Sequence, residues 1–206
     1  MSLINTEFER LKLILVRMSQ HVEKTLNNVK ELLEAQDIER RRVIWREVED
    51  FAITLESMRR DFIDEALLFI ARRQPLGEDL VSTHIMINIA YDVYRISRYC
   101  REIAKVDSLL APSSGLSSIP SIRELFEKSV IAVKVALKDL VEFSSRRISV
   151  VDEIDTYMDR AYQEILQELV SNKVIPRELG VKALIARHVE RIVDHAQYIE
   201  QHLSKL

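Results

Sequence analysis

The sequence predicts an all-α protein built from two three-helix bundles in tandem. Only 3 Gly and 4 Pro occur among the 206 residues, and they cluster at a few places. The long stretches between them are filled with Leu, Ile, Val, Ala, Glu and Arg, most of which are good helix formers. Apolar residues recur there at helical spacing. A chain of this length can bury a substantial core.

Three helices are expected in the first part of the chain, over residues 8–33, 37–72 and 78–106. Asp37 can accept hydrogen bonds from the exposed amides of the second helix's first turn. Pro75 ends that helix, because a residue before proline disfavours the helical conformation.

Three more helices are expected after residues 111–120, which have the composition of a flexible connection. The chain is therefore divided into a first repeat (1–110), a linker (111–120) and a second repeat (121–206). Ser121–Glu124 and Ser149–Asp152 match the capping-box pattern and predict helix starts, and Pro176 suits the first turn of the last helix. The three helices are expected over residues 121–147, 149–171 and from 176 nearly to the C-terminus.

The two halves also resemble each other in sequence. A shift of 96 residues lays Ile89–Ile103 on Ile185–Ile199, and six of the fifteen positions are then identical. Chance similarity between helical segments of this composition is the alternative. The matching three-helix order on both sides favours duplication.

Composition limits the function. Thirty basic residues against thirty-three acidic ones give a net charge of −3, which argues against a nucleic-acid-binding surface. Short arginine clusters are interpreted as solvated helix surface, with docking to acidic partners or lipid head groups as the alternative. The single cysteine and the absence of a secretory signal or a long apolar run favour a soluble protein of the cytoplasm.

A group of acidic residues is the most informative chemical feature. Asp152, Asp155 and Asp159 lie at positions i, i+3 and i+7, so they project from one face of a helix. Glu190 and Asp194 repeat the four-residue spacing. If the last two helices pack antiparallel, the acids converge, and a cation with oxygen ligands (iron, manganese, zinc or magnesium) would relieve their repulsion.

The alternative is a set of local ion pairs without a metal. Arg187 and Arg191 each precede an acid by three residues, and such pairs on a solvated face contribute under ~1 kcal/mol. His195 points about 100° away from Asp194 on a helix and is a poorer ligand. Cys100 is interpreted as a packing residue. Neither half carries the Glu-x-x-His ligands of di-iron bundles, so enzymatic activity is not favoured.

Two motifs resemble those of the PhoU family, which regulates phosphate uptake. Residues 72–80, RRQPLGEDL, are similar to that family's RQPxAxDLR turn, and residues 186–196, ARHVERIVDHA, are similar to its ARxLERIGDHAxNI signature. The resemblance implies two three-helix repeats and a non-enzymatic regulator that binds a phosphate transporter or sensor-kinase components. It also implies self-association, peripheral membrane contact through partners, and multinuclear metal clusters, often of iron or zinc.

The family's E/D-x-x-x-D pairs carry over unequally to the two repeats. The second repeat keeps both pairs, so the resemblance implies that the metal ligands are Asp155, Asp159, Glu190 and Asp194. In the first repeat Tyr94 and Arg98 stand where the family has Glu and Asp. We therefore predict that the first repeat binds no metal cluster, since the arginine would repel a cation. Arg98 is expected to pair instead with Glu49 or Asp50.

Three functions remain open at this point. The first is a regulator of phosphate uptake with a metal site in the second repeat. The second is a regulator of another ion transporter whose metal site has decayed. The third is a carboxylate-bridged metalloprotein, either an enzyme or a metal store.

Overall fold

The computed structural model describes residues 3–110 and 115–206. It contains six long α-helices and one short 3₁₀ helix, and no strand occurs in these two ranges. The elements are α1 (Leu3–Leu32), α2 (Ile38–Arg73), α3 (Glu78–Leu110), η1 (Leu116–Ser118), α4 (Pro120–Glu142), α5 (Ile148–Ser171) and α6 (Arg177–Leu203). The all-α class with two three-helix repeats is confirmed. The domain boundaries themselves stay a prediction, and part of the predicted linker, residues 111–114, lies outside the described residues.

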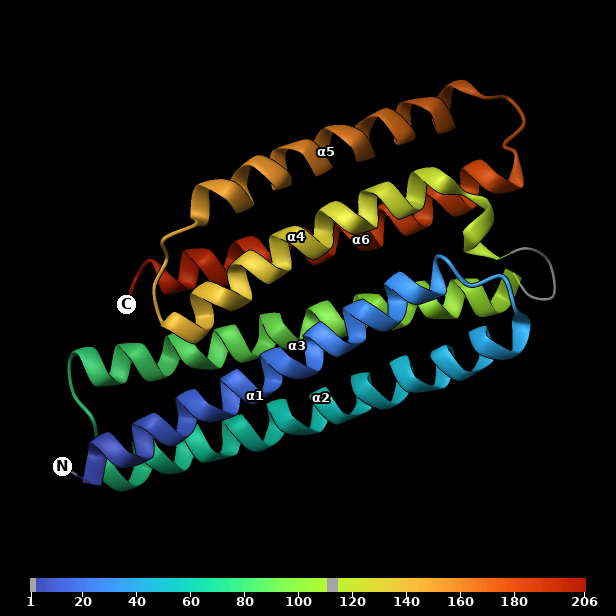
Figure 1. Cartoon of the computed structure of the whole chain (residues 1–206). Helices are drawn as coiled ribbons and strands as arrows, with labels where there is room; N and C mark the ends of the chain where they lie inside the picture. Colours follow the sequence, from blue (N-terminus) through green and yellow to red (C-terminus); the bar gives the residue numbers. More distant parts are fainter. Residues whose placement is uncertain (1–2, 111–114) are drawn as a thin grey trace.

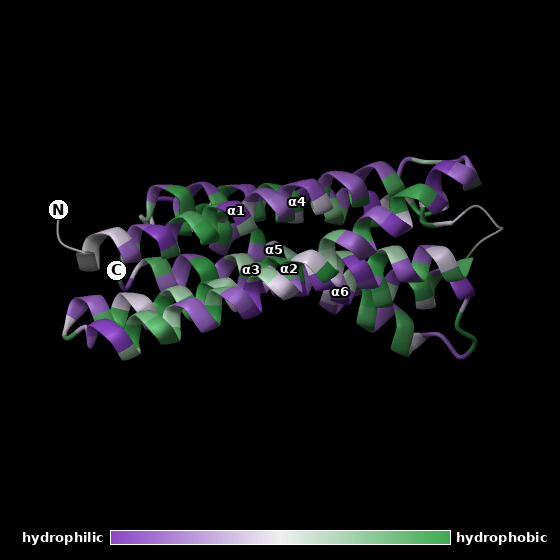
Figure 2. Ribbon diagram, turned by 90° about the horizontal axis from the view of Figure 1, so that it is seen from below, coloured by the Kyte–Doolittle hydropathy of each residue, from purple (hydrophilic) through white to green (hydrophobic). Residues whose placement is uncertain are grey.

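The helices form two layers (Figures 1 and 2). The helices α2, α3, α6 and α5 lie side by side in that order, with α3 packed against α6 at the centre, and α1 and α4 cover one side of this row. The α2–α3 turn and the α5–α6 turn lie at opposite ends of the molecule (Figure 1). This arrangement places α3 and α6, the two helices related by the 96-residue shift, next to each other.

The core follows the apolar periodicity of the sequence. Each helix sends a stripe of Leu, Ile, Val, Ala and Phe inward, and residues such as Leu15, Leu55 and Ile89 are fully buried. In α2, Val43 is 40% exposed, and the adjacent Ile44 is fully buried in the core. The long apolar stripes explain why helices of this length pack as bundles.

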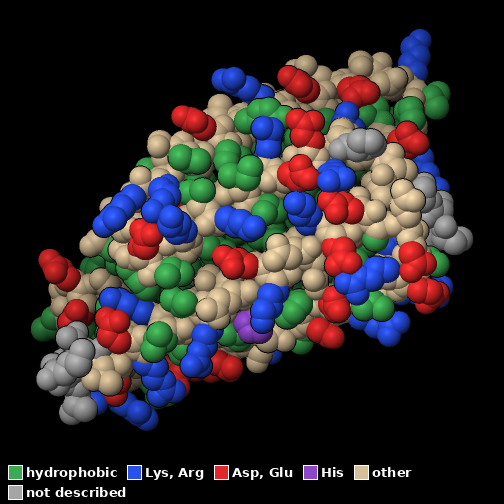
Figure 3. Space-filling view, in the orientation of Figure 1, with side chains coloured by type: hydrophobic (Ala, Val, Ile, Leu, Met, Phe, Trp, Pro, Cys, Tyr) green, Lys and Arg blue, Asp and Glu red, His purple; other side chains and the backbone are tan. Residues whose placement is uncertain are grey.

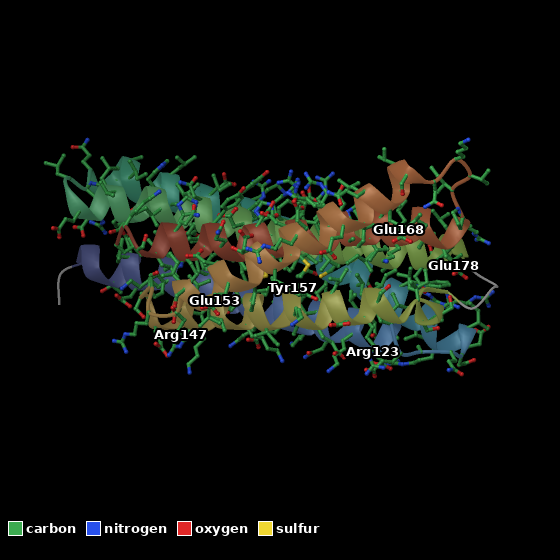
Figure 4. All side chains as sticks on the ribbon, turned by 90° about the horizontal axis from the view of Figure 1, so that it is seen from above. Arg123, Arg147, Glu153, Tyr157, Glu168 and Glu178 are labelled. Carbon is green, nitrogen blue, oxygen red and sulfur yellow. The ribbon has the colours of Figure 1, made fainter. Side chains whose placement is uncertain are left out.

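Helix starts depend on contacts that the local sequence does not reveal. Asp37 caps α2 as predicted and accepts from Arg40 N at 3.0 Å. Both predicted capping boxes are wrong, because α4 begins at Pro120 and α5 at Ile148, without a side-chain cap at either start. Before α5, Asp139 of α4 accepts a 2.7 Å hydrogen bond from the Arg147 amide instead. Figure 4 shows Arg147 at this turn.

A buried ion pair fixes the chain where it leaves the first repeat. Asp107 of α3 is fully buried and accepts from Arg41 Nε at 3.0 Å and from Trp45 Nε1 at 2.8 Å. Its other oxygen accepts from the Leu116 amide at 2.8 Å. A buried carboxylate needs such partners, because removing a charge from water costs several kcal/mol. Asp107 therefore ties α2, α3 and the segment before α4 together.

We expect Gly115→Ala to destabilise the protein by about 2 kcal/mol or more. Gly115 has a φ of +64°, and a Cβ there would overlap the Arg41 guanidinium and lie 2.7 Å from Asp107 Oδ1. The measurement is the free energy of unfolding in urea at pH 7. The matched control is Gly77→Ala, since Gly77 has a φ of +58° but no atom within 4 Å of an added Cβ. Equal losses in the two variants would contradict the role assigned to the Arg41–Asp107 contact.

Candidate functional site

Three of the four predicted ligands come together between α5 and α6. Asp159, Glu190 and Asp194 each offer a carboxylate oxygen, and these three oxygens lie within 4.8 Å of one another. The contact follows from the antiparallel packing of α5 on α6, which turns the acidic stripe of α5 toward the Glu190 and Asp194 pair. The expected convergence of acids is thus present, although their role as metal ligands stays a prediction.

Asp155 lies beside this cluster rather than in it. Gln197 Nε2 donates to Asp155 Oδ2 and to Asp152 Oδ1, both at 3.1 Å, and so bridges two acids of α5 from α6. Burial, and after it the negative charges of Asp159, Asp194 and Asp152, together raise the pKa of Asp155 to about 6. The charge of the cluster therefore acts on Asp155, although Asp155 is not one of the three acids that form it.

The surroundings of Glu190 and Asp194, the two acids of α6, disfavour their ionised forms. Burial raises the pKa of Glu190 and of Asp194, and the charge of Asp194 adds to the effect on Glu190. Glu190 is only 7% exposed. Its Oε2 is buried without a hydrogen-bond partner among the described residues, and Arg191 Nε lies 3.7 Å from it, beyond hydrogen-bond distance. This unpartnered oxygen fits a hard cation that takes oxygen ligands.

Two arginines compensate part of this charge. Arg187 Nη1 lies 2.5 Å from Glu190 Oε1, and Arg191 Nη1 lies 2.7 Å from Asp194 Oδ2. These are the local ion pairs that the sequence offered as the alternative to a metal. Each pair engages one oxygen of its carboxylate, and Glu190 Oε2 still has no hydrogen-bond partner among the described residues. Two guanidinium groups also face more carboxylates than they can neutralise, which agrees with the raised pKa values.

The corresponding place in the first repeat has a different chemistry. The prediction that Arg98 pairs with Glu49 is wrong, because Glu49 pairs with Arg101, whose Nε lies 2.6 Å from Glu49 Oε2. A hydrogen bond with Tyr94 raises the pKa of Arg98 instead. Arg101 lies almost one helical turn further along α3, so it reaches the acid of α2 that the sequence assigned to Arg98.

Sequence reasoning missed a polar contact at the centre of the molecule. Asp92 of α3 is 4% exposed and accepts from His195 Nδ1 of α6 at 2.8 Å, and His202 Nε2 lies 3.4 Å from its other oxygen. Tyr99 stacks on the His195 ring with the ring centres 5.8 Å apart. The residues are 103 positions apart, so no local spacing could have indicated the contact. The one signal in the sequence was the 96-residue shift, which makes Tyr99 and His195 equivalent positions of the two repeats.

Charged side chains of both signs cover the face of the molecule drawn in Figure 3, and they are interspersed. Within residues 3–110 and 115–206, no helix is long and apolar enough to cross a membrane. Cys100 is fully buried in the core, and burial raises the pKa of its thiol, as a packing residue requires.

We expect Asp155→Asn to stabilise the metal-free protein at pH 8 but not at pH 4. The pKa of Asp155 is about 6 in the folded state and 3.8 as the ordinary value, so the folded protein holds this proton more tightly. Stability therefore falls as the pH rises from about 4 to 6, and the whole cost is present above 6. Removing the charge should restore about 1 kcal/mol at pH 8, after allowance for solvent at this partly exposed site.

The measurement is chemical unfolding in EDTA at both pH values. Glu153→Gln is the matched control, since Glu153 is an exposed acid of the same helix (Figure 4). A gain that is equal at pH 4 and pH 8 would contradict the repulsion among these acids.

Comparison with known proteins places these features in a family. Residues 15–106 match the family model described as the PhoU domain. The chain is 28% identical over 207 aligned residues to a phosphate-specific transport system accessory protein PhoU homolog of Pseudomonas aeruginosa, covering 96% of this chain and 82% of the relative. A protein of the same description from Clostridium acetobutylicum is 24% identical, with 93% and 88% covered.

Two solved structures share the fold. The crystal structure of PhoU from Pseudomonas aeruginosa matches with a TM-score of 0.82 and 22% identity, and 97% of this chain and 96% of that chain are covered. The phosphate transport system regulatory protein PhoU from Streptococcus pneumoniae matches with a TM-score of 0.78 and 18% identity, covering 97% of this chain and 94% of that one. Both matches span the first and the second repeat.

Proposed function

Because the chain belongs to the PhoU family, we propose that it is a non-enzymatic regulator of phosphate uptake that acts in the cytoplasm by binding transport or sensor-kinase components. A role in phosphate-transport regulation is supported by relatives that are named as accessory proteins of a phosphate-specific transport system, more than four fifths of whose length the chain covers. The direct partner, the mode of binding and the cellular location are our proposals. Self-association into a homo-oligomer belongs to the same proposal.

The acids of the second repeat give a metal a structural role in this regulator. A cation held by Asp159, Glu190 and Asp194, with Asp155 beside them, would join α5 to α6 and offset the repulsion that raises the pKa values. The unpartnered Oε2 of Glu190 is the observation that supports this most directly. Oxygen ligands alone suit iron, manganese or magnesium, and zinc is compatible.

A regulator of another ion transporter with a decayed metal site is the second candidate. The observation in its favour is the pairing of Arg187 with Glu190 and of Arg191 with Asp194, which already removes part of the need for a cation. A carboxylate-bridged metalloprotein that carries out chemistry is less well supported, because the cluster lacks a histidine among its three members.

We expect purified protein to retain iron, manganese, magnesium or zinc in about stoichiometric amounts, and we expect Asp194→Asn and Glu190→Gln to lose it. Each substitution removes a ligand charge, and the remaining acids then repel less and bind a cation more weakly. The measurement is elemental analysis of protein prepared without chelators or a metal-affinity step. Glu153→Gln should keep the metal. Metal-free wild-type protein would favour the decayed-site candidate.

The regulatory role itself is tested in cells. Deletion of the coding sequence should change the rate of phosphate uptake at a fixed external phosphate concentration, and the wild-type chain should restore it. Cross-linking followed by mass spectrometry should recover components of a phosphate transporter or its sensor kinase. Unchanged uptake together with recovery of a different ion transporter would replace the first candidate with the second.

A further inference from the structure

A carboxyl group is enclosed near the C-terminal end of α6, where the turn between α4 and α5 (residues 143–147) meets that helix (Figure 1). Glu200 is fully buried. Its Oε2 accepts a hydrogen bond from Ser145 Oγ of the turn at 3.1 Å, and its Oε1 has no hydrogen-bond partner among the described residues. A hydroxyl group is therefore the hydrogen-bond donor that the fold supplies to this acid.

The basic group of the same turn is engaged by two other acids. Arg147 Nη1 pairs with Asp139 of α4, which is also fully buried, and the Arg147 amide donates to Asp139 Oδ2 at 2.7 Å. The two terminal nitrogens of Arg147 lie 3.2 and 3.3 Å from the oxygens of Glu142. The hydrogen bonds of this guanidinium thus go to Asp139 and Glu142 rather than to Glu200.

The acids that approach this end of α6 from α3 and α5 bind other residues of α6. Asp92 of α3 lies 3.4 Å from His202 Nε2, and Asp152 of α5 accepts from Gln197 Nε2 at 3.1 Å. Neither histidine nor amide therefore turns to Glu200. A buried carboxyl without a counter-ion is neutralised by taking up a proton.

The electrostatic surroundings of Glu200 act in the same direction. Burial, and after it the charge of Asp139, raises the pKa of Glu200 from the ordinary 4.5 to about 7, although the Ser145 hydroxyl and Arg147 favour the ionised form. The closed fold therefore holds this proton at pH 6 and loses it as the pH rises through about 7.

The turn itself is held in an unfavourable backbone conformation. Phe143 has a φ of +46°, in the left-handed region that a bulky residue rarely adopts. Its amide donates to Leu140 O at 3.1 Å, and Ser145 connects the turn to α6 through Glu200. Opening of the turn would relieve the strain at Phe143 and expose Glu200 to water.

From this geometry we propose that the α4–α5 turn is a pH-controlled closure, in which a proton on Glu200 keeps residues 143–147 packed on α6 and loss of that proton opens the turn. Ionisation makes the unpartnered Oε1 a charged atom, and a charged oxygen in the interior needs water or another donor. Opening also frees the start of α5 at Ile148. The proposal rests on these contacts and is independent of the regulatory function proposed above.

The test combines two measurements on full-length protein in EDTA. Carbon-13 NMR of the side-chain carboxyls should show Glu200 titrating near pH 7, with its signal assigned by its absence in Glu200→Gln. Hydrogen exchange should show that the protection factor of the Arg147 amide falls about tenfold between pH 6 and pH 8, because opening breaks its bond to Asp139. A carboxyl with a pKa of about 7 when closed and 4.5 when open gives a change of about this size.

Two substitutions separate the proton from the packing of the turn. Glu200→Gln keeps the shape and the acceptor for Ser145 but carries no charge, so the protection factor of Arg147 should be equal at pH 6 and pH 8. Ser145→Ala removes a donor that favours the ionised form, and it should raise the titration midpoint of Glu200 further. Glu153→Gln is the matched control, since Glu153 is an exposed acid of α5, and it should keep the tenfold change.

Titration of Glu200 below pH 5.5 in wild-type protein would overturn the proposal, and this result does not depend on any variant folding. Equal changes of Arg147 protection with pH in wild-type protein and Glu200→Gln would also overturn it. The regulatory function can fail independently, because these measurements on purified protein require no transporter or sensor kinase.

Discussion

The contact between α3 and α6 is the constraint on which the rest of the structure depends. These two helices share a stripe of buried Ile, Val and Ala residues, and each is the inner helix of its own repeat. A buried hydrogen bond between Asp92 and His195 fixes their register, since a shift along the axis would leave a buried carboxylate unpaired. With α3 and α6 fixed, α2 and α5 can pack only on the outer sides of the pair. The acidic cluster between α5 and α6 and the arginines beside Tyr94 are thus held at defined positions.

Local periodicity was sufficient to predict the helices and most of the core, because an amphipathic helix of thirty residues repeats its pattern many times. The approach of Asp159 to Glu190 and Asp194 also followed from spacing, since the short α5–α6 connection requires antiparallel packing. Contacts between distant residues could not be predicted this way. Asp139 displaced the expected cap at Ser149, and Arg101 rather than Arg98 reached Glu49, because lateral offsets between helices decide such partners.

The two repeats show how one backbone arrangement can support opposite electrostatic environments. Carboxylates between α5 and α6 remain partly uncompensated, and their raised pKa values are the cost of gathering like charges near a core. In the first repeat, aromatic rings take the place of counter-ions and support the guanidinium groups by stacking.

The enclosure of Cys100 has a practical consequence. It is the one cysteine in the chain, and its side chain is fully buried in the core between the packed helices. Oxidants and alkylating reagents that act on exposed thiolates will therefore leave the native protein unmodified. A cysteine introduced on the surface of α5 or α2 would react alone, so that fluorophores or spin labels could be attached at chosen positions and interhelical distances followed without first removing the natural thiol.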